Sequence, residues 1–147
     1  MGSHPCGHQA AKYLLLRGAN IDTQDYDKWT PLHGASNNGR TSIVQLLLQC
    51  GANKETKNTT WGRISQDVAD NEETEAVFRE FNEKGLKTKE DFLKQAVSEE
   101  NKDVAIILIF RGVSLEGSDT FKEFIQMIKK TGTLNCDFIR NQFPWIK

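Results

Sequence analysis

The sequence predicts an all-helical protein built from stacked helical repeats, and three observations favour this class. First, the segment Tyr13–Asn20 recurs as Leu46–Asn53, and the glycines in the two copies, Gly18 and Gly51, are 33 residues apart. A fixed period of this length is typical of repeat proteins. Second, apolar residues recur at helical spacing through most of the chain. Third, 37% hydrophobic residues and a net charge of −1 exclude disorder throughout, which requires low apolar content and high net charge.

The first helix of the clearest repeat is predicted to begin after Thr30. The threonine hydroxyl can cap the helix, and Pro31 suits the first helical position, where the missing N–H would have no helical partner in any case. Leu32 and Ala35 are then expected to face inward. Gly39 is expected to end the helix, because glycine readily adopts the left-handed conformation found at helix ends.

A second helix is predicted over residues 41–50, ended by Gly51. Its broad apolar stripe comprises Ile43, Val44, Leu46 and Leu47. We expect Leu47 to be fully buried between adjacent repeats. Residues 52–61 lack helical periodicity and are rich in Asn, Thr and Lys, which indicates an extended, β-hairpin-like connection.

The residues around these two helices carry a resemblance to a known family. The run Trp29–Ala35 reads Trp-Thr-Pro-Leu-His-Gly-Ala, and the second helix ends in Leu-Leu-Gln-Cys-Gly-Ala. This pattern resembles the ankyrin repeat, clearly over residues 7–53 and in degenerate form to about Gly112. The resemblance implies a solenoid of stacked helix-turn-helix units with short β-hairpin-like fingers. It also implies a structural, hydrogen-bonding role for His33.

The repeats divide the chain into expected segments. Residues 1–6 are expected to be disordered or derived from a tag, residues 7–113 to form the array, and residues 114–147 to form a helical C-terminal cap. Within the array we expect a partial repeat at 7–24, a full repeat at 25–57, and degenerate repeats at 58–85 and 86–113. Gly85 and Gly112 are only 27 residues apart, so the last repeat is predicted to lack a finger. For the end of the chain, a docking anchor made of Phe143, Trp145 and Ile146 is the alternative to a cap.

In ankyrin proteins the finger tips and the first helices line a concave groove that holds a partner. The resemblance therefore implies a non-catalytic protein–protein interaction module. Its partner-binding residues would be Tyr26, Asp27, Trp29, Asn37, Asn38, Thr59, Thr60, Arg63, Asn71 and Glu72. Tyr26, Trp29 and Arg63 are the expected anchors, because aromatic residues and arginine dominate interface energies. For Trp29, packing against the neighbouring finger is the alternative. A regulatory inhibitor of a kinase or transcription factor is the alternative function.

Other function classes find less support in the residues. Three cysteines without a C-x-x-C pair argue against a disulfide framework and favour a reducing compartment, so we expect a cytoplasmic or nuclear protein. In that compartment the glycosylation triplet Asn58–Thr60 would not be glycosylated. Without a basic stripe we expect no nucleic-acid partner, and without an apolar run of membrane length we expect no membrane contact. The chain is expected to be a monomer or a fragment of a longer chain.

No catalytic residue, cofactor or metal is predicted. His4, Cys6 and His8 alternate at the N-terminus, but a structural zinc site usually gathers four ligands. An enzyme or effector activity in the divergent half of the chain, residues 83–147, stays as an alternative because this half departs from the repeat and holds Cys136. A cysteine nucleophile requires a base within hydrogen-bonding distance, and no histidine is near Cys136 in the sequence.

Overall fold

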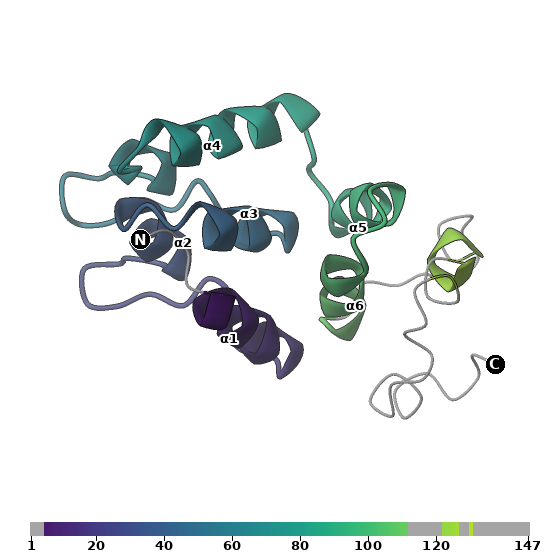
Figure 1. Ribbon diagram of the computed structural model, residues 1–147. Helices are drawn as coiled ribbons and strands as arrows, with labels where there is room; N and C mark the ends of the chain where they lie inside the picture. The colour runs from purple at the N-terminus through teal and green to yellow at the C-terminus, as the bar shows by residue number, and fades with distance from the viewer. Residues whose placement is uncertain (1–4, 112–121, 127–129, 131–147) are drawn as a thin grey trace. The chain divides into compact units, whose positions relative to one another are not determined.

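The computed structural model of the chain describes residues 5–111, 122–126 and 130. Six α-helices and one 3-10 helix have clear bounds in it, and Figure 1 shows them in order along the chain. They are α1 (Pro5–Leu16), α2 (Pro31–Asn37), α3 (Thr41–Gln49), η1 (Ser65–Val68), α4 (Glu72–Lys84), α5 (Lys89–Ser98) and α6 (Lys102–Phe110). No strand occurs in the described residues, which confirms the predicted all-helical class.

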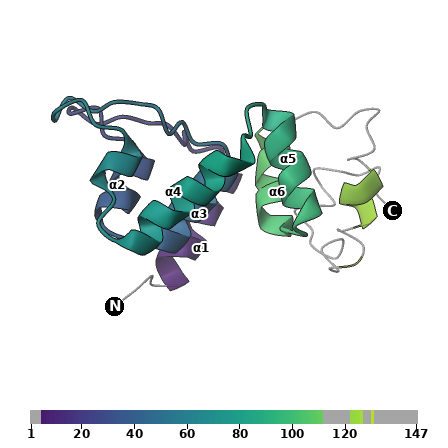
Figure 2. The same cartoon turned by 90° about the horizontal axis from the view of Figure 1, so that it is seen from above.

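The described residues fall into two compact units, one within residues 1–88 and one within residues 89–147. In the first unit, α1, α3 and α4 lie side by side in one row, and α2 packs against both α3 and η1 in a second row (Figure 1). Figure 2 shows the two long connections of this unit, residues 17–30 and 50–64, running next to each other. This arrangement is the predicted stack of helical repeats.

Helix α2 begins as the sequence predicts. The Thr30 hydroxyl accepts a hydrogen bond from the backbone N–H of His33 at 3.3 Å, and Pro31 is the first helical residue. Leu32 and Ala35 are buried, as predicted. The helix ends at Asn37, and Gly39 adopts a φ of +65°, so its predicted role in ending the helix is confirmed.

Helix α3 is the centre of the first unit's core, because α1, α2 and α4 all contact it. Val44, Leu46 and Leu47 are buried, as predicted for the apolar stripe, whereas Ile43 is only half-buried. Leu48, which lies outside the predicted stripe, is completely buried. The physical reason is that neighbouring helices cover α3 on more than one side, so its buried surface is wider than one amphipathic stripe.

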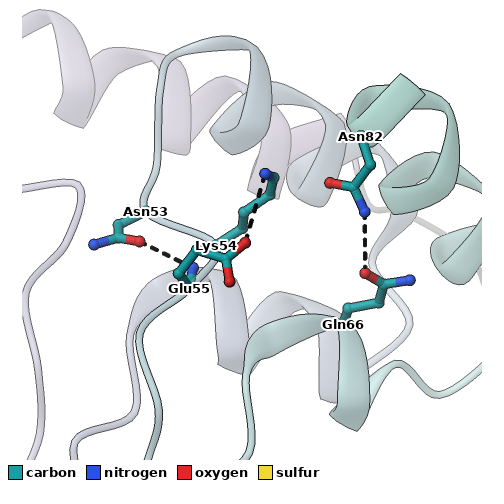
Figure 3. Close-up of polar contacts among 5 residues, drawn as sticks. All are labelled: Asn53, Lys54, Glu55, Gln66 and Asn82. Carbon is teal, nitrogen blue, oxygen red and sulfur yellow. Dashed lines mark hydrogen bonds and ion pairs between the residues drawn. The ribbon is translucent and has the colours of Figure 1, made fainter. Parts of the chain in front are cut away.

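The connection after α3 has the expected extended form without a regular ladder of backbone hydrogen bonds. Asn53 accepts a hydrogen bond from the backbone N–H of Glu55 through its side-chain oxygen at 2.9 Å (Figure 3). Asn20 makes the same local turn 33 residues earlier, with the N–H of Asp22 at 3.0 Å. Asp22 in turn accepts a hydrogen bond from the backbone N–H of Asn53 at 2.8 Å, which joins the two repeats.

The next repeat departs from the first in its outer helix. Where the complete repeat has α2, this one has the single 3-10 turn η1, followed by the longer α4. The Asn82 side-chain amide donates to the Gln66 side-chain oxygen at 3.2 Å and so links α4 to η1 (Figure 3). Thr41 and Thr74, 33 residues apart, share a hydroxyl hydrogen bond of 3.1 Å. The 33-residue register therefore continues into this degenerate repeat.

The second unit contains α5 and α6, which pack against each other. Their core residues, Leu93, Ala96, Val97 and Val104 to Leu108, are buried together with Phe124. Only residues 85–88 separate α4 from α5, so this connection has no finger, as the short glycine spacing predicts. The predicted segment boundaries, and the cap role of residues 114–147, stay predictions. Residues 1–4, Cys136 and the tail from Phe143 to Ile146 lie outside the described residues.

Candidate functional site

The first finger is closed by Asp25. The backbone N–H of Asp25 donates to the Trp29 carbonyl at 3.0 Å, and its carboxylate accepts from the N–H groups of Asp27 and Trp29, each at 2.9 Å. Lys28 adopts a positive φ of 59° to complete the turn. Tyr26 lies at the tip, where its side chain is fully exposed.

The second finger is closed in the same way by Asn58, the residue 33 positions after Asp25. Its backbone N–H donates to the Arg63 carbonyl at 2.9 Å, and its side-chain oxygen accepts from the Arg63 N–H at 3.0 Å. This finger is one residue longer than the first, and both Trp61 and Gly62 have a positive φ. A positive φ is unusual for a bulky residue. Here it leaves Trp61 80% exposed, with the Arg63 guanidinium carbon 4.9 Å from the centre of its ring.

The two fingers are joined through three hydrogen bonds. The backbone N–H and the hydroxyl of Thr59 both donate to the Asp27 carbonyl, at 2.8 and 3.0 Å. The Trp29 indole N–H donates to the Thr60 hydroxyl at 3.4 Å. Trp29 is half-buried, so it packs against the neighbouring finger and still reaches the surface.

His33 connects α2 to the second finger. Its ring is fully buried, and Nε2 lies 2.9 Å from the Arg63 carbonyl. Because a carbonyl only accepts, Nε2 donates this hydrogen bond, and Nδ1 accepts one from the Thr30 N–H at 3.2 Å. The Thr30 hydroxyl also lies 2.9 Å from Nδ1. These bonds confirm the structural role that the resemblance implied for His33.

A surface groove of about 330 Å³ lies beside the second finger. Its lining comes from Trp29 and α2 in one repeat and from the finger and η1 of the next. The lining residues are Trp29, Asn37, Asn58, Thr60, Trp61, Arg63, Asp67, Val68, Ala69 and Asp70. Four of the ten predicted partner-binding residues, Trp29, Asn37, Thr60 and Arg63, are brought together here.

The other six predicted residues do not line this groove. Tyr26 and Asp27 lie in the first finger, and Thr59 bridges the two fingers. The Asn38 side chain donates to the Gly34 carbonyl at 2.8 Å, and Asn71 caps α4 by accepting from the Thr74 N–H at 2.8 Å. Glu72 is exposed in the first turn of α4. A role for these residues in binding stays a prediction.

The groove also contains residues that the sequence interpretation missed. Trp61 is the clearest of these residues. The sequence could have indicated it, because it is an aromatic residue in the finger position that Lys28 occupies one repeat earlier. Asp67 stands where His33 stands in the complete repeat, and its carboxylate accepts from the Ile64 N–H at 3.1 Å. Val68 is the last residue of η1, and Ala69 and Asp70 follow in the turn before α4.

Two further side chains considered in the sequence have structural positions. Asn58, the first residue of the glycosylation triplet, is 3% exposed, and its side-chain nitrogen is buried without a hydrogen-bond partner. Glycan attachment at that nitrogen would require the finger to open. Cys50 is buried in the core, consistent with packing. Within the described part of the chain, no group of three His, Cys, Asp or Glu residues could hold a metal ion, and no helix could span a membrane.

Comparison with known proteins places the resemblance in the first unit. The sequence model of the family described as ankyrin repeats (3 copies) matches residues 4–61. The chain is 36% identical over 62 residues to protein phosphatase 1 regulatory subunit 12A of Mus musculus, which covers 42% of this chain and 6% of the relative. The chain is 39% identical over 62 residues to protein fem-1 homolog A of Danio rerio, and this match covers 40% of this chain and 10% of the relative.

A shorter relative shows a similar level of identity. Protein phosphatase 1 regulatory subunit 27 of Homo sapiens is 33% identical over 69 residues, which is 47% of this chain and 44% of the relative. The chain therefore spans less than half the length of each of these relatives.

Proposed function

Residues 4–61 of this chain are ankyrin repeats, and from this premise we propose that the chain is a non-catalytic module that binds a protein partner through its finger tips and the adjoining groove. The observation that carries the proposal is the meeting of Trp29, Trp61 and Arg63 at one groove built from two successive repeats. Aromatic residues and arginine are the side chains that most often dominate the energy of protein interfaces.

The exposure of the finger residues supports a protein partner in particular. Tyr26 is fully exposed and Trp61 is 80% exposed, although both are large aromatic side chains. Their backbones are held by the hydrogen bonds of Asp25 and Asn58, so the tips present them on ordered turns. An extended surface with aromatic residues at successive finger tips suits a macromolecule that contacts both fingers.

A regulatory role is the second candidate, and the names of the relatives favour it. Two of them are named as regulatory subunits of protein phosphatase 1. The chain is about as similar to a fem-1 homolog, with 39% identity over 62 residues, so the level of identity does not select a partner. Regulation would require that partner binding here changes an activity of the partner, as for an inhibitor of a kinase or transcription factor. We also propose a cytoplasmic or nuclear location, supported by three cysteines without a disulfide pattern.

The experiment compares variants of the full chain in a quantitative binding assay. Proteins captured by the wild type from cell extract are identified, purified and titrated against Tyr26→Ala, Trp61→Ala and the double variant. Tyr13→Ala is the matched control, because Tyr13 is also an exposed aromatic residue but lies on α1. Trp29 is not substituted, since its hydrogen bond to Thr60 makes it part of the fold.

If the tips are interface anchors, the double variant should bind a partner about thirtyfold more weakly, as expected for the loss of roughly 2 kcal/mol at a hot spot. The control should bind with the affinity of the wild type. If every titrated partner binds the double variant as well as the wild type, while circular dichroism shows both to be equally folded, the proposed binding surface is wrong.

A further inference from the structure

The groove beside the second finger has a chemistry that selects a particular side chain. We propose that it receives a positively charged lysine or arginine side chain from an extended segment of the protein partner. This inference rests on the proposed function and adds the class of ligand to it. Three properties of the groove support it: its aromatic walls, its carboxylates and its size.

The aromatic walls are Trp29 and Trp61, one from each finger. Indole rings attract cations through their negative faces, more strongly than the other aromatic side chains do. The chain itself provides an instance, because the Arg63 guanidinium carbon lies 4.9 Å from the centre of the Trp61 ring. The Arg63 guanidinium therefore takes up one face of the Trp61 indole. Since the Trp61 side chain is 80% exposed, its opposite face is the one offered to the partner's cation.

One carboxylate comes from η1 and the other from the turn between η1 and α4. Asp67 and Asp70 line the groove, and both residues are exposed. The only basic residue in the lining is Arg63, so the lining carries one more negative than positive charge. Glu72 and Glu73 follow directly in the first turn of α4 and are also exposed. A cationic side chain entering the groove is thus met by complementary charge, whereas an anionic one is met by repulsion.

The size of the groove fits one long side chain with part of its backbone. Its volume of about 330 Å³ is near the lower limit of small-molecule sites. The aliphatic stem of lysine or arginine can lie along Val68, Ala69 and the indole rings, while the charged head reaches the carboxylates. An extended segment can enter such a groove without the partner having to unfold.

The test uses the full chain labelled with ¹⁵N and four acetylated, amidated pentapeptides, in which a central arginine, lysine, glutamine or glutamate is flanked by alanines. Binding is followed by the indole N–H signals of Trp29 and Trp61. The arginine and lysine peptides should give saturable shifts at millimolar concentrations, weaker as ionic strength rises. The glutamine and glutamate peptides should give none that saturate.

Two variants connect the shifts to the proposed groups. Asp67→Asn with Asp70→Asn removes both charges while keeping an oxygen to accept from the Ile64 N–H, and it should weaken binding of the arginine peptide about fivefold. Glu75→Gln, an exposed acid within α4 that does not line the groove, is the matched control and should have no effect. Trp61→Ala should also weaken binding.

The outcomes separate this inference from the function on which it rests. Equal binding of the glutamine and arginine peptides, or no indole shift with any peptide, would overturn the inference. So would tight binding of the glutamate peptide that is lost in Arg63→Ala, because that result assigns the groove to an anion. In each case, a purified partner whose affinity still falls in the Tyr26/Trp61 double variant would leave the proposed function standing. A partner indifferent to that variant would remove the proposed function itself.

Discussion

His33→Ala should destabilise the first unit by about 3 kcal/mol, most of it through hydrogen bonds within and between repeats. The imidazole accepts from the Thr30 N–H and donates to the Arg63 carbonyl, and it is completely buried. Thr30 is itself only 4% exposed, so removing the ring leaves its N–H buried and unpaired, at a cost of about 1–3 kcal/mol. The lost bond to Arg63 adds about 1 kcal/mol.

Two other contacts set the limits of this estimate. The Arg63 carbonyl keeps its hydrogen bond from the Asn58 N–H, so it is not left unpaired. The imidazole also packs 5.6 Å from the Trp29 ring, centre to centre, and the alanine variant loses that contact as well. The bond that the Arg63 carbonyl keeps lowers the cost of the substitution, and the lost contact with the Trp29 ring raises it again. The total loss of unfolding free energy therefore stays at about 3 kcal/mol. Small domains are stable by only about 5–15 kcal/mol, so the effect should be large.

The assay is a urea titration followed through the indole N–H signals of Trp29 and Trp61, which both report on the first unit. Asp67→Ala is the matched comparison, because Asp67 takes the place of His33 in the next repeat but is exposed and accepts only from the Ile64 N–H. It should cost about 1 kcal/mol or less. If His33→Ala costs no more than Asp67→Ala, the imidazole is not the link between the repeats and the reasoning is refuted.

Three further substitutions, with one control substitution, test the packing and the turns by the same titration. Leu47→Ala should lower the free energy of unfolding by about 2–5 kcal/mol, because Leu47 is 4% exposed between helices. The control Gln45→Ala, on the exposed side of α3, should lower it by less than about 0.5 kcal/mol. Similar losses for both would show that the helix register is wrong. Gly39→Ala should lower the free energy of unfolding by at least about 1 kcal/mol, since φ is +65° and a Cβ would lie 2.7 Å from the Asn71 side-chain nitrogen. An unchanged midpoint of the urea titration would contradict that geometry. Lys28→Gly should stabilise the first finger by up to about 1 kcal/mol, because its φ of 59° is strained for lysine; destabilisation would mean that the lysine side chain contributes more than the strain removes.

The helices of the complete repeat could be predicted because local chemistry determines them. Thr30 suits the position that caps a helix, Pro31 suits the first helical position, and Gly39 suits the end of a helix. The burial of Leu48 could not be read from the stripe of α3, since it depends on which neighbouring helices cover each side. The reduction of the next outer helix to η1 is consistent with the loss of the Thr-Pro-Leu-His run after Arg63.

The candidate groove could be predicted only in part, for reasons of local context. Trp29, Thr60 and Arg63 were recognised because they align with the fingers of the repeat. Asn71 was assigned to the same surface, yet its side chain caps α4, and sequence alone cannot separate a capping asparagine from one that binds a partner. Trp61 was missed because the corresponding residue of the complete repeat, Lys28, is not aromatic and was not among the residues assigned to binding.

The central claim is that partners bind beside the second finger, and site-specific photocrosslinking tests it most directly. A photoreactive phenylalanine analogue would replace Trp61 in one sample and Tyr13, on α1, in another. Crosslinks to a purified partner from position 61, with few or none from position 13, are the result that we predict. Efficient crosslinking from position 13 with none from position 61 would contradict the claim and would move the interface to α1.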